Sequence, residues 1–319
     1  MNLLTKISLS KAQNQIDYSS QLLLLGSCFS ENIGAKFEYY KFQGLQNPFG
    51  ILFHPLAIEK VIQRAVQEYV YTEDDVFFLN EQWHCFDAHS ELSNPSKEKI
   101  ISDLNREVEQ TLVQLKQTSH VIITLGTAWV YLNTLNAQVV ANCHKVPQKD
   151  FTKELLSVSK VKESLQCIIA LVKSVNPEVQ FIFTVSPVRH LKDGFVENQL
   201  SKAHLISAIH QVIDSDGISY FPSYEIMIDE LRDYRFYAKD MIHPSEIAIE
   251  YIWEKFVEVW IDETSNGVMK KVDEIKRGLQ HRAFNPEGEA HQKFLKSLTH
   301  KIAYIQNAYP FMDFKTSKA

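Results

Sequence analysis

The sequence feature that most constrains the fold is a series of short apolar runs separated by long helical patterns. Residues 21–25, 120–125 and 179–185 are almost wholly apolar, and a glycine or a Ser-Pro pair follows each of them. Strands that are apolar on both faces are typical of a parallel sheet with helices packed on both sides. A fourth run over 218–221 continues the series. The pattern therefore predicts a three-layer α/β/α sandwich with a mostly parallel sheet.

Apolar residues at helical spacing fill the gaps between these runs. In residues 97–117, for example, Ile101, Leu104 and Val108 recur at steps of three and four residues. Beyond residue 262 the chain shows helical patterns and no strand. We therefore expect a main domain over 1–262 and a helical C-terminal extension over 263–319. Further helices of the main domain are expected over 30–40, 58–70, 158–175, 199–214 and 244–259.

Composition and charge exclude several classes of function. With 319 residues, 45% of them hydrophobic, the chain can bury a core without metal or disulfide staples. A net charge of −6 gives no electrostatic reason to bind nucleic acid or an anionic membrane. The four cysteines form no CxxC pair and no apolar run is long enough to span a bilayer, so we expect a cytoplasmic protein with free thiols. The scattered histidines and the absence of GxGxxG or Walker patterns predict no metal site and no cofactor.

The first candidate for chemistry is the turn after the first apolar run, Gly26-Ser27-Cys28-Phe29-Ser30. A glycine turn between a strand and a helix places the next side chains at the sheet edge and at a helix N-terminus, where the dipole favours an anion. A thiol there can have its pKa lowered, which produces a reactive thiolate. Backbone N–H groups of the same turn can bind an oxyanion. The alternative is that Cys28 is a small buried core residue, as free cysteines often are.

The second candidate is Asp240 with His243, which lies three residues later and just before the last helix expected in the main domain. This spacing lets the carboxylate orient the imidazole, and an oriented imidazole can activate a nucleophile. An isolated Asp-x-x-His is usually structural, but its position after the last expected strand favours the functional interpretation.

Together the two segments resemble the SGNH/GDSL hydrolases, which carry a nucleophile in a turn after the first strand and an Asp-x-x-His before the last helix. The segment Leu25-Gly26-Ser27-Cys28-Phe29-Ser30 more closely resembles the signature of the GSCFA-domain family, which is grouped with the SGNH-like fold. Ser30 stands where that signature has Ala. Other segments between residues 20 and 260 also resemble the family: Asn47-Pro48-Phe49-Gly50, Asp87-Ala88-His89-Ser90, Asn142-Cys143-His144-Lys145-Val146-Pro147, Ser186-Pro187-Val188-Arg189-His190, Ser201-Lys202 and Tyr234-Arg235-Phe236-Tyr237.

The resemblance implies an SGNH-hydrolase or flavodoxin-like sheet with strand order 2-1-3-4-5. It also implies roles for four residues at the expected site. Cys28 becomes the first choice of nucleophile and Ser27 the second. His243 becomes the base, with Asp240 as its orienting acid.

The same resemblance implies an incomplete oxyanion site. Gly50 matches the SGNH glycine whose N–H binds the oxyanion. Ala128 stands where the SGNH pattern has Asn, so one donor must be supplied elsewhere or is missing. Thr127 and Asn47 are the candidate side-chain donors, and the loss of such a donor costs about 10²–10³ in rate.

Three further residues are candidates for substrate binding. His89 lies in a loop expected near the site. His144 follows Cys143, and adjacent residues of an extended segment point to opposite faces, so His144 alone is expected to face the cleft. Arg189 lies just beyond a strand end, where it suits a substrate carboxylate or phosphate. The alternative for Arg189 is an ion pair with one of the acidic residues in 229–233.

These observations predict an acyl-ester hydrolase or an acyltransferase that uses a Cys or Ser nucleophile with a His/Asp pair. The expected substrate is a small-molecule or carbohydrate-type ester. The alternative is an SGNH-like protein that has lost its oxyanion donors and binds a ligand or a protein partner without catalysis.

Overall fold

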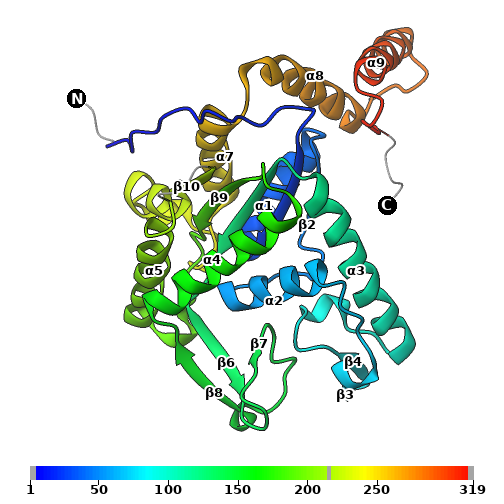
Figure 1. The fold of residues 1–319 in the computed structure, drawn as a ribbon. Helices are drawn as coiled ribbons and strands as arrows, with labels where there is room; N and C mark the ends of the chain where they lie inside the picture. The colour runs from blue at the N-terminus through cyan, green and yellow to red at the C-terminus, as the bar shows by residue number, and fades with distance from the viewer. Residues whose placement is uncertain (1–4, 214–216, 315–319) are drawn as a thin grey trace.

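A computed structural model of the chain describes residues 5–213 and 217–314. Within these residues, five parallel strands form the main sheet in the order β10-β9-β5-β1-β2 (Figure 1). If these five strands are numbered 1 to 5 along the chain and read from the β2 edge, the order is 2-1-3-4-5, as predicted. The strands are β1 (Gln21–Gly26), β2 (Gln43–Gln46), β5 (His120–Leu125), β9 (Gln180–Val185) and β10 (Ile218–Phe221). The predicted α/β fold with a parallel sheet is confirmed.

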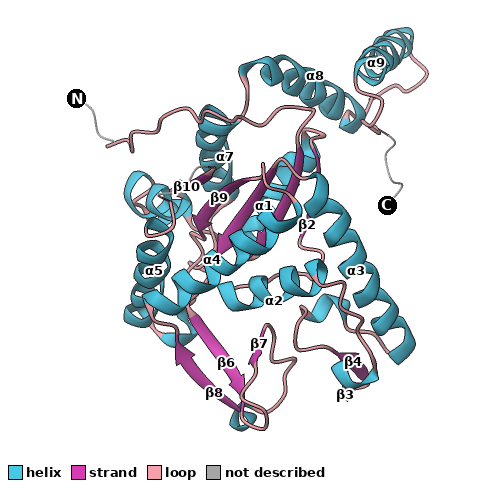
Figure 2. Cartoon of the chain, in the orientation of Figure 1, coloured by secondary structure: helices cyan, strands magenta, loops and turns pink. Residues whose placement is uncertain are grey.

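Helices cover both faces of the sheet, as Figure 2 shows. Alternate residues of each strand point to opposite faces, so Leu23 and Leu25 enter one core while Leu22 and Leu24 enter the other. The first core packs against α2 (Pro55–Val66), α3 (Lys97–Gln117), α4 (Val158–Val175) and α5 (Phe195–His210). The second packs against α1 (Cys28–Tyr39) and α7 (Glu246–Trp260).

Most helix bounds follow the apolar periodicity, and the differences have local causes. The bounds of α3 and α4 agree with the prediction, and Ser96 and Ser157 cap them by accepting the N–H groups of Lys99 and Lys160. Helix α2 begins earlier than expected, where His54 acts as the N-cap and Pro55 occupies the first turn. Helix α5 also begins earlier, at Phe195, and the last residue predicted for it, Asp214, lies outside the described residues.

The sequence patterns did not indicate the edge strand β2 or the small antiparallel pieces. These are a hairpin of β3 (Phe77–Leu79) and β4 (Gln82–His84), and a second sheet of β6 (Trp129–Asn133), β7 (Val139–Val140) and β8 (Phe151–Leu155). All are short, and several carry exposed polar residues, so neither a continuous apolar run nor a clean alternation marks them. Short helical turns complete the described chain: Glu73–Asp75, Ser90–Leu92, Gln148–Asp150, Leu191–Asp193, Ser223–Glu225, Ile226–Glu230 and Tyr234–Phe236.

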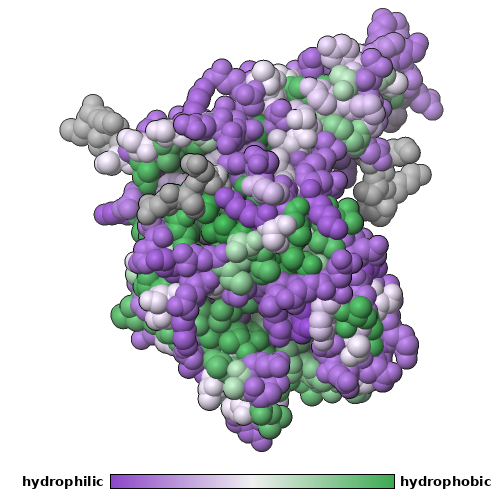
Figure 3. Space-filling view, in the orientation of Figure 1, coloured by the Kyte–Doolittle hydropathy of each residue, from purple (hydrophilic) through white to green (hydrophobic). Residues whose placement is uncertain are grey.

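The C-terminal segment forms α8 (Glu263–Gln280) and α9 (Glu289–Ala308), at the end of the molecule remote from β6 and β8 (Figure 1). Met269 and Val272 of α8 and Leu298 of α9 join the second core. Hydrophilic residues predominate around the outer end of this helix pair in Figure 3. No helix among the described residues is both long and apolar enough to cross a membrane.

Candidate functional site

The turn after β1 is shaped by Gly26, whose φ of 135° lies in a region that L side chains rarely adopt. A Cβ at this position would overlap the carbonyl of Thr124 on the neighbouring strand β5. Ser27 is the N-cap of α1, but its side chain is fully buried and its Oγ has no hydrogen-bond partner among residues 5–213 and 217–314. Cys28 is the first residue of α1 and is only partly buried. The turn therefore presents Cys28, rather than Ser27, toward the carboxyl edge of the sheet.

The Cys28 thiol experiences opposing influences. Burial raises its pKa, and the nearby Glu31 carboxylate raises it further. The Lys202 ammonium and the backbone N–H groups of Cys28 and Phe29 act in the opposite direction. The net pKa is raised, so the lowering expected from a helix N-terminus is present but is outweighed by burial.

Lys202 ties the carboxyl ends of two strands together beside Cys28. Its side chain is almost fully buried, and Nζ donates to the carbonyls of Gly126, 2.7 Å away, and Ser186, 2.8 Å away. These residues directly follow β5 and β9. Burial lowers the pKa of Lys202 to about 7, and the Cys28 thiol opposes this shift. Lys202 can therefore change its protonation state near neutral pH, next to the candidate nucleophile.

His190 connects Lys202 to the loop that carries the Asp-x-x-His pair. Burial lowers the pKa of His190 to about 3, and the charges of Lys202 and His243 contribute to the shift. Its Nε2 is buried without a hydrogen-bond partner in the described chain. The preceding residue holds the loop in place, since the backbone N–H of Arg189 donates to the carbonyl of Ile242 at 3.2 Å.

Asp240 and His243 form the pair predicted from their spacing. Asp240 Oδ1 accepts the backbone N–H groups of Ile242 and His243 at 2.9 and 3.0 Å, and Oδ2 accepts His243 Nδ1 at 2.6 Å. The N–H of His243 contributes most to lowering the pKa of Asp240 to about 2, so the carboxylate stays ionised near neutral pH. The carboxylate fixes the imidazole tautomer and leaves Nε2 for chemistry. Both side chains are nearly half exposed.

A base for Cys28 should lie within hydrogen-bond reach of the thiol, or one water molecule further away in the free protein, and no direct hydrogen bond joins His243 to Cys28 in the part of the chain that the structure describes. Charge interactions link Cys28 with Lys202, and they link His190 with both Lys202 and His243. Lys202 and His190 therefore connect Cys28 to His243 electrostatically. The Asp240 turn holds His243 toward the surface, with 47% of its side chain exposed, whereas Cys28 lies deeper. The two groups share one edge of the sheet without touching.

The three oxyanion candidates differ in whether a donor is free. The Gly50 N–H donates to the Asn47 carbonyl at 2.7 Å in a tight turn, so it is already engaged. The Thr127 hydroxyl bonds with Ser201 Oγ at 3.0 Å and accepts the Trp129 N–H at 3.0 Å. Asn47 Oδ1 accepts the Gly26 N–H at 2.9 Å, and the Asn47 side chain also interacts with the Glu31 carboxylate, whose pKa this contact lowers. Its buried Nδ2 makes no hydrogen bond of good geometry within the described residues, so of the three donors it is the least firmly engaged.

His89 and His144 occupy different environments. His89 packs against Gly50, has its Nδ1 3.5 Å from a Glu91 carboxylate oxygen, and acts electrostatically on Glu31 beside Cys28. His144 is buried, and its Nε2 donates to the Cys85 carbonyl at 2.7 Å. Burial lowers the pKa of His144 to about 4, which keeps it neutral. His89 thus borders the candidate site, whereas His144 supports a loop.

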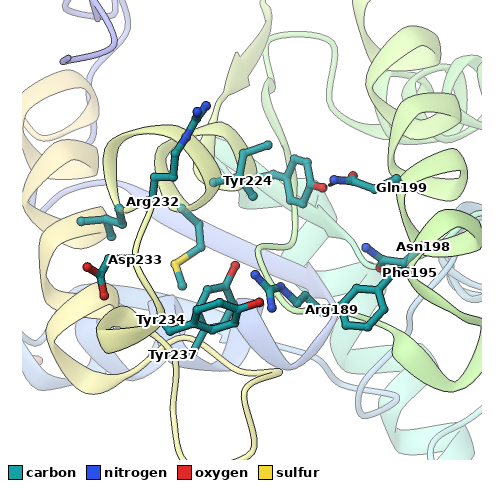
Figure 4. A pocket seen from close by; sticks show the side chains of 12 residues that line it. Arg189, Phe195, Asn198, Gln199, Tyr224, Arg232, Asp233, Tyr234 and Tyr237 are labelled. Atoms are coloured by element: carbon teal, nitrogen blue, oxygen red, sulfur yellow. Dashed lines mark hydrogen bonds between the residues drawn. The ribbon is translucent and has the colours of Figure 1, made fainter. Parts of the chain in front are cut away.

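Arg189 lines a pocket of about 430 Å³ next to the Asp240 loop (Figure 4). Its guanidinium carbon lies 3.8 Å from the ring centre of Tyr237 and 5.5 Å from that of Tyr234. On the opposite wall, the Tyr224 hydroxyl donates to Gln199. The remaining lining residues are Phe195, Asn198, Met227, Ile228, Leu231, Arg232 and Asp233.

Three residues of this site, Lys202, His190 and Glu31, have no role predicted from the sequence. Lys202 carries a readable signal, because it falls on the buried face of α5 with Asn198 and Leu205 at helical spacing. A lysine on such a face needs polar partners inside the protein. His190 and Glu31 carry no comparable signal, since their neighbours come from other segments. The described residues contain no group of three or more potential ligands arranged for a metal ion.

Comparisons with known proteins identify relatives at the level of family. Residues 21–256 match the model of the GSCFA family, and residues 272–319 match that of the GSCFA domain protein, C-terminal domain. No curated protein sequence matches the chain.

Two solved structures show a distant similarity. One is an acetyl xylan esterase (Est2A) from the rumen bacterium Butyrivibrio proteoclasticus, with 12% identity and a TM-score of 0.39, where the match covers 77% of this chain but only 64% of the esterase. The other is a carbohydrate esterase family 3 protein from Talaromyces cellulolyticus, with 7% identity, a TM-score of 0.36 and coverage of 80% and 99%.

Proposed function

The chain belongs to the GSCFA family, and on that premise we propose that it is an acyl-ester hydrolase or acyltransferase with Cys28 as nucleophile and His243 as base. The observation that carries the proposal is the 2.6 Å hydrogen bond between Asp240 and His243 at the sheet edge that Cys28 also occupies. An ionised carboxylate on Nδ1 leaves Nε2 as the nitrogen that exchanges a proton with the reacting groups.

The reaction follows from these positions. The Cys28 thiolate attacks the ester carbonyl carbon, a C–S bond forms, and the leaving alcohol takes its proton from the His243 imidazolium. Water, or the hydroxyl of an acceptor, then attacks the thioester while His243 removes its proton, and the Cys28 thiolate leaves. On ester binding, the half-exposed imidazole must come within hydrogen-bond reach of the reacting atoms.

Lys202 and Asn47 complete the proposed site. The Lys202 ammonium stabilises the thiolate against the burial that disfavours it. The backbone N–H groups of Cys28 and Phe29 lie at the first turn of α1, where no intrahelical acceptor reaches them. Together with Asn47 Nδ2 they are the proposed donors for the oxyanion, and Asn47 must release its contact with Glu31 to take this role. Asn47 would then replace the Asn that the SGNH pattern has at the position of Ala128.

The substrate class we propose is an ester of a carbohydrate-type alcohol. The pocket beside the Asp240 loop is lined by Tyr224, Tyr234 and Tyr237, of which Tyr234 is exposed and the other two are largely buried. Tyrosine combines an apolar ring face with a hydroxyl, which suits the alternating C–H and O–H surface of a sugar.

The test is turnover of a panel of short-chain acyl esters by wild type and three single variants. Cys28→Ala should lower kcat/KM by at least about 10³-fold, because loss of a nucleophile removes the covalent step. Ser27→Ala should retain activity, since that side chain is buried away from the edge. Cys143→Ala is the matched cysteine control and should behave like wild type. Turnover that survives Cys28→Ala, or disappears with Ser27→Ala, would overturn the assignment of the nucleophile.

A second candidate function is ligand binding without catalysis. The raised pKa of Cys28 and the absence of a hydrogen bond to His243 in the described chain favour it. The same panel separates the two candidates. A wild-type protein that turns over no ester, yet binds a ligand in the tyrosine-lined pocket, would identify the binding protein.

A further inference from the structure

Arg189 lacks the acidic partner that the sequence offered it. Asp229 pairs with Arg232, and Asp233 pairs with Arg235 at 2.8 Å. Within the described residues Arg189 makes no ion pair, and its only side-chain hydrogen bond is a long one of 3.5 Å to the Met241 carbonyl. An unpaired guanidinium in a pocket retains most of its donors for a ligand.

The Arg189 guanidinium is held in place by aromatic stacking rather than by a counter-charge. It lies 3.8 Å from the centre of the buried Tyr237 ring, and Figure 4 shows Tyr234 and Tyr237 together beside it. Stacking on one face leaves the edge of the planar fork free for in-plane hydrogen bonds. Burial raises the pKa of Tyr224 to about 12, and the positive charge of Arg189 acts in the opposite direction. Tyr224 therefore lies close to the guanidinium.

The pocket is directly connected to the catalytic loop. The Arg189 backbone N–H donates to the Ile242 carbonyl, one residue before His243. The neighbouring His190 N–H donates to Asn198 Oδ1 at 2.9 Å, and Asn198 also lines the pocket. A substrate group in the pocket would therefore lie beside the ester bond that His243 serves.

We propose that this pocket binds an anionic group, a carboxylate or a phosphate, carried on the sugar-like ring of the substrate. Arg189 forms in-plane hydrogen bonds to the anion, and the rings of Tyr234 and Tyr224 contact the sugar. This inference rests on the proposed function, because it names the substrate class of the same site. It makes Arg189 a specificity-determining residue that selects acidic over neutral sugar esters.

The binding test uses the full chain and three probes: D-glucuronate, D-glucose 6-phosphate and neutral D-glucose. Wild type should bind at least one anionic sugar about tenfold or more tightly than glucose in calorimetric titrations, because a charge-assisted pair adds at least that much affinity. Arg189→Met should abolish the preference. Arg189→Lys should reduce it without abolishing it, which decides the matter if the Met variant folds poorly. Arg106→Met is the matched control, since Arg106 is an arginine of α3 that pairs with Asp103 and does not line the pocket.

The outcomes separate this inference from the proposed function. If wild type shows no preference for either anion, or if Arg189→Met keeps the preference, the inference is wrong whatever the enzyme hydrolyses. An equal loss in Arg106→Met would also overturn it. Acetate release from O-acetylated glucuronate and O-acetylated glucose then tests catalysis separately. An anion preference without Cys28-dependent release would refute the proposed function and leave the binding site standing.

Discussion

Two regions of the molecule bring cysteine and histidine together, and they differ in how the histidines are used. The sheet-edge site comprises Cys28, Lys202, His190, Asp240 and His243. The hairpin cluster lies around β3 and β4 and comprises Cys85, Cys143, His84 and His144. In the hairpin cluster, His144 donates to the Cys85 carbonyl at 2.7 Å, and His84 contacts the Leu79 carbonyl and Ser93 Oγ at 3.0 and 2.6 Å. No carboxylate hydrogen-bonds to either histidine among the described residues.

The difference separates the histidine that we propose as catalytic from two structural ones. The hairpin-cluster histidines satisfy loop carbonyls in place of backbone donors, so their hydrogen bonds contribute to stability. At the sheet edge, His243 has an ionised acid on one nitrogen and an accessible second nitrogen, whereas the second ring nitrogen of His144, Nδ1, is buried without a hydrogen-bond partner in the described chain. Unsatisfied buried polar atoms occur in both regions, so the accessible second nitrogen of His243 is what separates them.

The largest expected effect is a contrast between two histidine variants, one of which should lose activity while the other loses stability. His243→Ala should lower kcat by about 10²–10⁴ and leave stability nearly unchanged, because the side chain is nearly half exposed and acts as an acid and base. His144→Ala should leave kcat of the folded protein nearly unchanged. It should cost about 1–3 kcal/mol of unfolding free energy, because the Cys85 carbonyl loses its donor in a buried place. Ester turnover gives kcat and urea unfolding gives the free energy of unfolding for both variants.

The comparison breaks if the two variants give the opposite result. A His144→Ala protein that is stable but inactive would transfer the catalytic role to the hairpin cluster. His243→Gln is a useful companion, since it retains a hydrogen bond to Asp240 without an acid–base function. It should therefore be as inactive as His243→Ala.

The sequence predicted the fold well because burial on both sides of a sheet leaves a strong pattern. The runs that became β1, β5 and β9 are apolar at nearly every position, and helices α3 and α4 have the predicted bounds. Strand β2, Gln43–Gln46, was missed because an edge strand needs to bury little, and its side chains are all partly or fully exposed. The β6–β8 sheet was missed because its short strands mix core residues such as Val130 with exposed polar ones such as Thr152 and Lys153.

A smaller effect is expected from Lys202, the residue that distinguishes the sheet edge from the hairpin cluster electrostatically. Lys202→Met removes the ammonium that lowers the Cys28 pKa, so the thiol pKa should rise and kcat/KM near pH 7 should fall about tenfold. The pH dependence of Cys28 alkylation measures the first quantity and ester turnover the second. Lys255→Met is the matched control, because Lys255 of α7 is also mostly buried but pairs with the carboxylate of Glu230. A thiol pKa unchanged in Lys202→Met would restrict Lys202 to holding the ends of β5 and β9.

The candidate site could be predicted only where its residues are close in sequence. Asp240 and His243 are three residues apart, and their hydrogen bond follows from the local turn. The distance from Cys28 to His243 depends on loops from several strands, and no sequence pattern encodes it. The fates of Gly50 and Thr127 as oxyanion donors were likewise hidden, because each depends on whether a nearby group has already taken the hydrogen bond.

The smallest expected effect is the difference in alkylation rate among the four thiols. Burial raises the pKa of Cys85 to about 12 and that of Cys167 to about 11, so at neutral pH both should be nearly inert to iodoacetamide. Burial also raises the pKa values of Cys28 and Cys143, but only Cys28 has Lys202 and helix N–H groups acting in the opposite direction. Cys28 should therefore react fastest, ahead of Cys143 by only a few-fold, since burial offsets most of the advantage. Peptide mass spectrometry over a time course gives the four rates in one sample, and His243→Ala should slow only that of Cys28. If Cys143 reacts first, the hairpin cluster holds the more reactive thiol. Lys202 and the helix N–H groups would then not make Cys28 more reactive than a cysteine without such neighbours.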